Sequence, residues 1–462
     1  MKKTDASEGS EGLILKESLS IGKNNHLLLR GIDLVELGNE YGTPLFVFDE
    51  RTLADTFENF RRAFESIYPR MMVCYSIKTN SNLAVCRILG ERGAFAEVSS
   101  ELDLQVALRA GFSGDRIIFD GPFKPEEALR RALREKILLI NVESFSEMER
   151  LDRIAGEMGI KQPVGIRVNT FKKSSLFDHA NLVNLISAAY CNLDSRFGFS
   201  LEDAYLAFER AKKFQNLSIE GVMTHPYRAA TRVLLPMIRE IHERFGIEMR
   251  YLDIGGGFDP GTTRFVGTTD FVYDFLRRKI GLKSKLREEK AATNVESTAK
   301  RLIGQIKEGL EGLSKPIIIV EPGRFLTSGA GILLLRVDHV KDAGGYRWAM
   351  VDGGTNIIPR FNFIELRKIV VANKASNAPE EQVNIVGPLL YNEDFISLKT
   401  ELPKISEGDT LSVFDCGAYT LSRANQFLHA RPPAVLLSSN GEVKVIREKE
   451  TFEDFSRKDI LS

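Results

Sequence analysis

The sequence has few cysteines, no excess of charge of either sign and no long apolar run. Four of its 462 residues are cysteine, and none forms a C-x-x-C pair, which argues against a disulfide framework and a structural zinc site. Lys and Arg number 63, as do Asp and Glu, so no basic excess favours nucleic acid or an anionic membrane as a partner. No stretch approaches roughly 18 uninterrupted apolar residues, which predicts no membrane span. We expect a cytoplasmic protein with free thiols, no signal peptide and no metal site.

The length favours two domains, and the pattern along the chain changes once. Residues 1–12 are predicted to be a flexible tail. Over residues 45–328, short apolar runs alternate with helical stretches eight or nine times. This alternation predicts parallel strands in an open doubly wound sheet or in a closed (β/α)8 TIM-type barrel, and the number of repeats favours the barrel. Short apolar strands separated by turns in residues 13–44 and 329–462 predict a mainly antiparallel β-sandwich domain.

Polar or glycine-rich residues follow the predicted barrel strands. Lys78, Glu97, Asn169 and His225 each stand at a strand end, and DIGGGF and EPGR close two further strands. In a barrel these ends meet at one face, where active sites lie. A lysine amine there is costly if it is buried without a partner or a lowered pKa.

Two of these loops are candidates for binding an anion. The glycines 255–257 let backbone N–H groups approach an anion, although a tight turn explains them equally well. Arg324 can hold a phosphate or carboxylate through paired hydrogen bonds, and a surface ion pair is the alternative. A histidine taken alone is more often structural than catalytic, which applies to His225, and Tyr419 in DCGAYT is a weak signal by itself.

Taken together, these residues favour pyridoxal 5'-phosphate as the cofactor. A lysine forms a Schiff base with the cofactor aldehyde, and a glycine-rich loop accommodates the phosphate. A carboxylate beside the pyridine nitrogen keeps that nitrogen protonated, so that the ring withdraws electrons. Lys78, the glycine loop, His225, Glu321 and Arg324 supply this set of groups.

The order of these motifs resembles the barrel-type pyridoxal-phosphate decarboxylases of the alanine racemase-like fold, which include the diaminopimelate and ornithine decarboxylases. YSIKTN resembles the family's Y-A-x-K-A-N, and AEVSSELDL, LDIGGGF and EPGR resemble later signatures in order. The resemblance implies a carboxy-lyase that decarboxylates an α-amino acid, a homodimer with shared active sites, and Lys78, His225 and Glu321 as catalytic residues. The cofactor contacts that it implies are Lys78, Glu97, Ser100, His225, Gly255, Gly256, Gly257, Glu321, Gly323, Arg324 and Tyr419.

The chain departs from the family where the substrate is read. The family segment G-P-x-C-x-x-x-D is GPLLYNED here, so Leu390 replaces a cysteine that the resemblance places across the dimer interface. Tyr391 replaces the glutamate that reads the distal end of diaminopimelate, whereas Asp394 is retained. These changes predict a substrate other than diaminopimelate. The predicted substrate residues are Arg324, Arg360, Tyr391, Asp394 and Cys416, although Cys416 is equally well explained as a buried core residue.

Two other interpretations remain open. Leu390 is also compatible with another pyridoxal-phosphate reaction on this fold, such as racemisation, elimination or decarboxylative bond formation. Glu321 argues against racemisation, because the resemblance expects an arginine at that position in the racemases. A non-catalytic cofactor-binding protein is the second alternative, and the intact cofactor set argues against it. A diamino acid, a modified amino acid and an amino acid tethered to a carrier protein all remain open as substrates.

Overall fold

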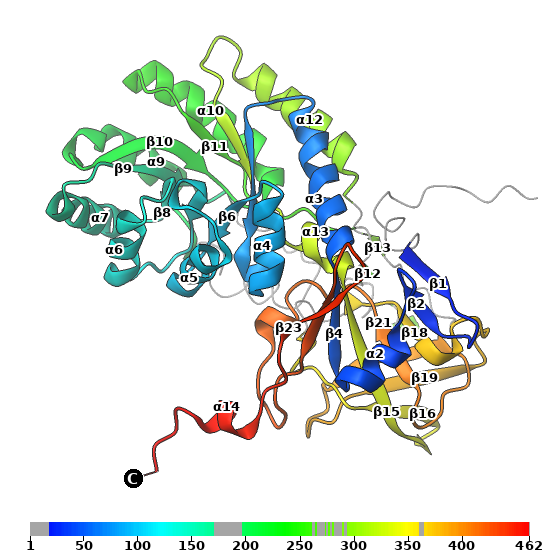
Figure 1. Cartoon of the computed structure of the whole chain (residues 1–462). Helices are drawn as coiled ribbons and strands as arrows, with labels where there is room; N and C mark the ends of the chain where they lie inside the picture. The colour runs from blue at the N-terminus through cyan, green and yellow to red at the C-terminus, as the bar shows by residue number, and fades with distance from the viewer. Residues whose placement is uncertain are drawn as a thin grey trace, which may run out of the picture. The chain divides into compact units, whose positions relative to one another are not determined.

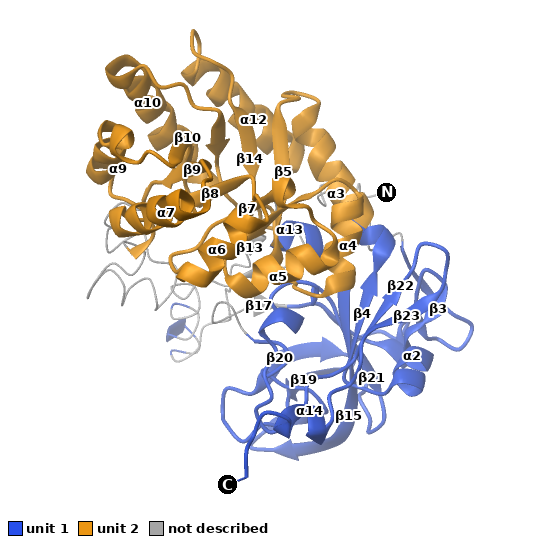
Figure 2. Cartoon of the chain, turned by 60° about the vertical axis from the view of Figure 1, so that its left-hand side comes forward, with its two compact units in different colours: residues 1–53, 260–292, 324–462 blue, residues 54–259, 293–323 orange. Residues whose placement is uncertain are grey.

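The computed structural model describes residues 18–170, 196–260, 293–359 and 365–461, with 264–265, 273, 276–277, 280 and 289–290. The chain divides into two compact units (Figure 2). We call residues 54–259 and 293–323 the barrel unit, and residues 1–53, 260–292 and 324–462 the sheet unit. No helix in the described ranges is both long and apolar enough to cross a membrane.

Eight parallel strands of the barrel unit close into a barrel, with helices between successive strands (Figure 1). The spatial order is β10-β11-β14-β5-β6-β7-β8-β9, so the predicted (β/α)8 TIM-type barrel is confirmed. The strands are β5 (Met71–Ser76), β6 (Phe95–Val98), β7 (Ile117–Phe119), β8 (Leu139–Val142), β9 (Gln162–Arg167), β10 (Leu217–Met223), β11 (Tyr251–Asp253) and β14 (Ile317–Val320). The helices are α3 (Glu50–Glu65), α4 (Leu83–Glu91), α5 (Glu101–Ala110), α6 (Glu126–Arg134), α7 (Phe145–Met158), α9 (Leu201–Glu209), α10 (Tyr227–Phe245) and α12 (Val295–Gly309).

Local capping residues fix where the barrel helices begin and end. Ser100 and Ser144 each accept a backbone N–H from the first turn of α5 and α7. Gly111 and Gly159 end the same helices in the left-handed conformation that glycine adopts without strain. The segments between β6 and α5 and between β8 and α7 are therefore short, and they hold polar side chains close to the end of the barrel.

An apolar cluster inside the barrel lies below these strand ends. Buried side chains from β5, β7, β8, β11 and β14 pack together, namely Cys74, Ile118, Leu139, Tyr251 and Ile319. Two positions further along each of these strands the buried residue is polar. The apolar layer excludes water from the barrel interior and supports a polar layer at the carboxyl ends of the strands.

The sheet unit is built on a nine-stranded sheet with the path β20-β19-β16-β15-β4-β22-β23, to which β21 and β18 are added. Two neighbouring pairs, β16–β19 and β4–β22, are parallel and the other pairs are antiparallel, so the predicted mainly antiparallel sheet domain is confirmed. Its strands are β4 (Leu45–Asp49), β15 (Gly331–Ala343), β16 (Tyr346–Val351), β18 (Ile369–Val371), β19 (Glu381–Val386), β20 (Phe395–Leu402), β21 (Thr410–Val413), β22 (Ala434–Leu437) and β23 (Val443–Arg447).

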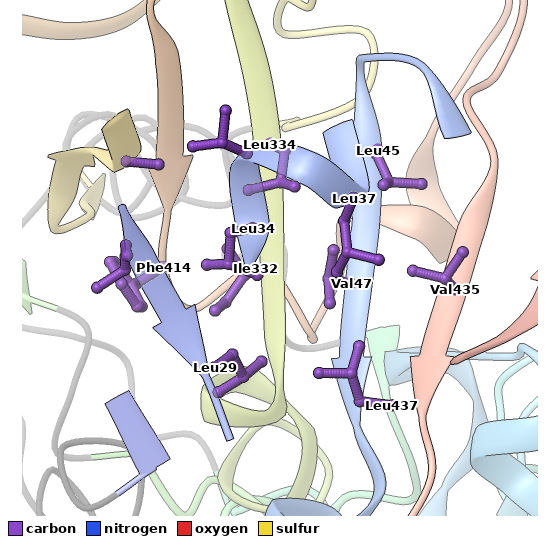
Figure 3. Packing of buried hydrophobic residues seen from close by; sticks show 13 residues of the cluster. Leu29, Leu34, Leu37, Leu45, Val47, Ile332, Leu334, Phe414, Val435 and Leu437 are labelled. Atoms are coloured by element: carbon purple, nitrogen blue, oxygen red, sulfur yellow. The ribbon is translucent and has the colours of Figure 1, made fainter. Parts of the chain in front are cut away.

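A second hydrophobic core fills the sheet unit, and its central strands come from distant parts of the sequence. Val47 of β4, Ile332 of β15 and Val435 of β22 pack in one cluster (Figure 3). Leu34 and Leu37 of α2 (Leu34–Tyr41) join the same cluster (Figure 3). The amino-terminal hairpin β1 (Leu19–Ile21), β2 (Leu27–Leu29) and β3 (Ile32–Asp33) also contributes, through Leu27 and Leu29.

The strand at residues 45–49 corrects one prediction. We expected LFVFD to begin the barrel, but β4 pairs antiparallel with β15 and parallel with β22 in the sheet unit. All five residues are buried. A continuous apolar run indicates a strand covered on both faces, and it carries no information about which of two sheets the strand joins.

Candidate active site

Lys78 lies just beyond the carboxyl end of β5, in the short 3-10 helix η1 (Ile77–Thr79). Its Nζ donates hydrogen bonds to Glu97 Oε2 at 2.5 Å and to Ser99 Oγ at 3.0 Å. The lysine side chain is 44% exposed, whereas Ile77 and Thr79 on either side are buried. The structure therefore places an accessible amine on a rigid support and compensates its charge with one buried carboxylate.

Glu97 of β6 is the partner that holds Lys78. Its carboxylate accepts further hydrogen bonds of 2.5 Å from Ser76 and from Ser99. Burial opposes ionisation of Glu97, but the charge of Lys78 and the hydrogen bonds from Lys78, Ser76 and Ser99 outweigh burial and lower its pKa. Glu97 thus stays anionic and fixes the position of the amine.

Glycines allow the segments after β11 and β14 to pack against their neighbours. A Cβ atom on Gly323 would lie 2.1 Å from Thr79 Oγ1, so any side chain there would displace the helical turn that carries Lys78. A Cβ atom on Gly256 would lie 2.5 Å from the carbonyl oxygen of Glu321. These glycines bring the ends of three strands close together.

The glycine loop also fixes two neighbouring side chains. Gly255 N–H donates to Asp253 Oδ1 at 2.9 Å, and Gly256 N–H donates to His225 Nδ1 at 3.1 Å. Gly255 and Gly257 have φ values of +69° and +94°, a conformation that favours glycine. Two of the three N–H groups that we predicted to face an anion therefore have acceptors within the protein, and phosphate binding by this loop stays a prediction.

His225 follows β10 and presents one defined tautomer. Because Nδ1 accepts the Gly256 N–H, the proton of the neutral ring resides on Nε2. The ring is accessible to solvent, yet the surrounding barrel atoms desolvate it, and the charges of Lys78 and Arg167 add to this, so that its pKa is lowered to about 4. His225 is therefore a neutral hydrogen-bond donor at physiological pH.

Three buried carboxyl groups lie close together at the carboxyl ends of the barrel strands, and we call them the carboxyl cluster. They are Asp120 at the end of β7, Asp253 of β11 and Glu321 directly after β14, and oxygens of all three lie within 4.8 Å of one another. Asn141 Nδ2 on β8 donates to Asp120 Oδ1 at 2.6 Å and to Asp253 Oδ2 at 3.2 Å. Sequence reasoning found Glu321 and missed Asp120, Asp253 and Asn141.

Glu321 meets the requirement of a pyridoxal-phosphate ring. It is 5% exposed, and its Oε1 has no hydrogen-bond partner among the described residues. An unsatisfied buried oxygen costs free energy unless a ligand supplies a donor. A protonated ring nitrogen is such a donor, so the carboxyl is suited to the role predicted for it.

A buried ion pair supports the segments that carry Asp120 and Asn141. Lys124 is fully buried, and its Nζ lies 2.8 Å from Glu147 Oε1 of α7. The same Nζ donates to the carbonyl oxygens of Gly121 at 2.7 Å and Asn141 at 2.8 Å. Lys124 therefore links the end of β7, the strand β8 and the helix α7.

Replacing Lys124 by methionine is expected to lower the free energy of unfolding by about 3–5 kcal/mol, because Glu147 would remain buried without its partner. The measurement is chemical denaturation of the purified variant. Lys161→Met removes an exposed lysine as the control. The double variant Lys124→Met with Glu147→Leu should regain most of the loss, and equal destabilisation by the single and double variants would contradict this interpretation.

The structure places five predicted site residues in the sheet unit. Arg324 begins α13 (Arg324–Thr327), and its guanidinium lies 5.6 Å from the ring centroid of Tyr419. Tyr391, which is 40% exposed, shares a hydrogen bond with the Thr355 hydroxyl. Arg360 lies outside the described residues. No substrate role is established by these positions.

Asp394, Cys416 and Ser100 each have a local structural role. Asp394 is 4% exposed, and its carboxylate accepts the N–H groups of Thr355 and Leu389, both at 2.7 Å. Cys416 is fully buried, and its thiol lies 3.5 Å from the carbonyl oxygen of Phe414, which fits the core interpretation. Ser100 Oγ caps α5 by accepting the Asp103 N–H at 3.1 Å.

The barrel, the accessible lysine, the buried carboxyl of Glu321 and the glycine loops together define a barrel-type pyridoxal-phosphate enzyme. The profile of the pyridoxal-binding domain of pyridoxal-dependent decarboxylases matches residues 52–328, and that of their C-terminal sheet domain matches residues 270–417. This chain belongs to the pyridoxal-dependent decarboxylase family, so it is a carboxy-lyase that uses pyridoxal phosphate.

Whole-length relatives and solved structures agree with this assignment. The chain is 32% identical to the diaminopimelate decarboxylase of Methanothermobacter thermautotrophicus, covering 95% of this chain and 96% of the relative. It is 30% identical to that of Aquifex aeolicus, covering 93% and 95%. The crystal structure of diaminopimelate decarboxylase from M. jannaschii in complex with L-lysine has a TM-score of 0.81 at 27% identity, covering 96% of this chain and 98% of that one.

Proposed function

We propose that the enzyme removes the α-carboxylate of a free amino acid as CO2, with Lys78 as the residue that holds the cofactor. The observation that carries this proposal is the unsatisfied, buried Oε1 of Glu321 in the same unit as the accessible, ion-paired amine of Lys78. The first is an acceptor suited to the ring nitrogen of the cofactor, and the second is a nucleophile suited to its aldehyde.

The chain's own residues would divide the work as follows. When bound, pyridoxal phosphate supplies an electron sink for the bond to the departing carboxylate. Lys78 Nζ would hold the cofactor covalently and yield to the substrate amine, while Glu97 keeps that amine in place. Glu321 would accept the ring N–H through Oε1, and neutral His225 would offer its Nε2–H.

The identity of the substrate rests on two opposing observations. The relatives that match along the whole chain are named diaminopimelate decarboxylases, and this gives no support for excluding that substrate. Leu390 and Tyr391 alone argue for a different distal group, because a leucine and a phenol replace a thiol and a carboxylate. The geometry around them places the Tyr391 hydroxyl against Thr355, where it can still donate to or accept from a substrate.

Release of CO2 from individual amino acids tests the proposal. The purified enzyme with added pyridoxal phosphate would be incubated with diaminopimelate, lysine, ornithine, arginine and a panel of other amino acids. Mass spectrometry would identify the products. Loss of CO2 from at least one of them is expected. Exchange of the α-proton alone would favour racemisation, and bound cofactor that reacts with no amino acid would favour the non-catalytic alternative.

We also propose a cytoplasmic homodimer. The described cysteines, Cys74, Cys86 and Cys416, are free thiols, which supports a reducing compartment. Leu390 is 88% exposed, and Phe427, whose ring centroid lies 5.9 Å from that of Tyr391, is 53% exposed. Exposed apolar side chains of this size support a protein interface. Light scattering after gel filtration should show a dimer that Leu390→Asp weakens, and a monomer with full activity would contradict it.

A further inference from the structure

Among the described residues, no cation is paired with the carboxyl cluster. Asp120, Asp253 and Glu321 are 3%, 0% and 5% exposed. In the part of the chain that the structure describes, no lysine, arginine or histidine forms a salt bridge with any of the three. The nearby Arg167 is paired with Glu143 at 2.5 Å, and Lys78 is paired with Glu97. Three negative charges at this separation inside a protein would repel one another strongly.

The hydrogen-bond donors around the cluster are unequally shared. Asp253 accepts two N–H groups, from Gly255 and Asn141, and Asp120 accepts one, from Asn141. Glu321 Oε1 receives none from the described residues. Asp253 therefore has the most hydrogen-bond donors of the three, and a proton shared between Asp120 and Glu321 would supply the donor that this pair lacks.

The electrostatic environment raises the pKa of all three carboxyl groups, which favours a proton within the cluster at neutral pH. Burial and the neighbouring carboxylates raise the pKa of Glu321 well above its usual range, and burial and the charge of Glu97 raise that of Asp120. Burial and the charge of Asp120 raise the pKa of Asp253 to about 8. Arg167 of β9 partly offsets these effects at Asp120, and among the described residues Glu97 and the buried thiol of Cys74 on β5 also interact electrostatically with the cluster.

We propose that Asp120 is a positioning residue for Glu321. In the cofactor-free protein the two carboxyl groups share a proton, which keeps Glu321 in place with Oε1 available to the cofactor ring. The cluster therefore holds a proton before the cofactor binds. The ring nitrogen would then contact a carboxylic acid and not several carboxylates that repel one another. This inference rests on the proposed cofactor site, but its first consequence is a property of the chain without cofactor.

Infrared spectroscopy of the cofactor-free full-length protein at pH 7 tests this directly. Surface carboxyl groups are ionised at that pH, so the carbonyl band of a protonated carboxylic acid reports buried acids. Wild type should show the band, and Asp120→Asn should weaken it, because the proton shared by Asp120 and Glu321 loses one of its two carboxyl groups. Asp115→Asn, which changes an exposed aspartate, is the matched control and should leave the band unchanged.

The pH dependence of stability gives a second readout. Acids whose pKa is raised by folding stabilise the protein below their unfolded pKa, and this contribution is lost as the pH rises through the folded value. The melting temperature of cofactor-free wild type should therefore fall between pH 6.5 and 9, a window above the range in which His225 titrates. Asp120→Asn should show a smaller fall, and Asp115→Asn should follow wild type.

Two results would overturn the proposal. One is a wild-type protein without the carboxylic acid band at pH 7, a result that does not require the variant to fold. The other is a folded Asp120→Asn protein with the wild-type band and the wild-type pH profile. Failure of the proposed function is distinguishable, because it would be seen as a protein that passes these cofactor-free tests and then takes up no pyridoxal phosphate.

Discussion

Replacing Lys78 by alanine is expected to lower the rate of CO2 release by at least about 10³-fold, because the variant loses the nucleophile that we propose holds the cofactor. The same variant should lose the absorbance of the covalently bound cofactor. The reason is geometric: the Lys78 amine is accessible, and Glu97 and Ser99 hold it at a strand end of the barrel. Steady-state kinetics and an absorption spectrum measure both effects.

The control for this variant is Lys161→Ala, which removes an exposed lysine of the barrel unit. It should keep the wild-type rate and spectrum. A folded Lys78→Ala enzyme that retained either the turnover or the cofactor absorbance would contradict the assignment of Lys78. Circular dichroism should first confirm that Lys78→Ala is folded, so that a loss of fold is not mistaken for a loss of activity.

Changing Glu321 to glutamine is expected to lower kcat by about 10²–10³-fold while pyridoxal phosphate still binds. The substitution keeps the size of the side chain but replaces a carboxyl that can stabilise a protonated ring nitrogen by an amide that cannot. The buried, unsatisfied Oε1 is the observation on which this expectation depends. The loss should fall on kcat and not on the substrate KM, because Glu321 is assigned to the cofactor.

Glu311→Gln is the matched control, because Glu311 is exposed in the same unit. It should not change kcat. An unchanged kcat in Glu321→Gln would show that the ring nitrogen has another partner, and a loss confined to KM would assign Glu321 to the substrate. The absorption spectrum of each variant establishes that the cofactor is present during the measurement.

The general architecture could be predicted because it depends on periodicity. Alternating apolar runs and amphipathic stretches specify parallel strands with helices outside, and the number of repeats separates a barrel from an open sheet. The strand at residues 45–49 could not be assigned, because β4 is buried on both faces like a barrel strand and its partners β15 and β22 lie about 280 and 390 residues away. Long-range pairing of this kind leaves no local pattern.

The site could be predicted where a residue is unusual at a strand end. Lys78, Glu97, His225 and Glu321 were identified because a charged or titratable group follows an apolar strand. Asp120 follows the strand RIIF in the same way and carried a signal that was available from the sequence. A rule that took every polar strand end of a predicted barrel would have found it.

Other parts of the site depend on which atoms meet, and spacing along the chain does not encode this. Asn141 lies within a strand and bridges two carboxyl groups from different strands. Ser100 and Asp394 matched sequence motifs, but their oxygen atoms are occupied by the backbone N–H groups of Asp103, Thr355 and Leu389. Local caps and loop-organising aspartates look the same as ligand-binding residues until their partners are known.

The central claim is that the Lys78 amine carries the cofactor, and reduction with borohydride followed by peptide mass mapping tests it most directly. Reduction converts the bond between the lysine and the cofactor aldehyde into a stable amine, which marks the residue permanently. We predict the added mass on the peptide that contains Lys78 and its absence from all other lysine peptides. Modification of a different lysine, or no modification in a protein that has been supplied with pyridoxal phosphate, would contradict the account.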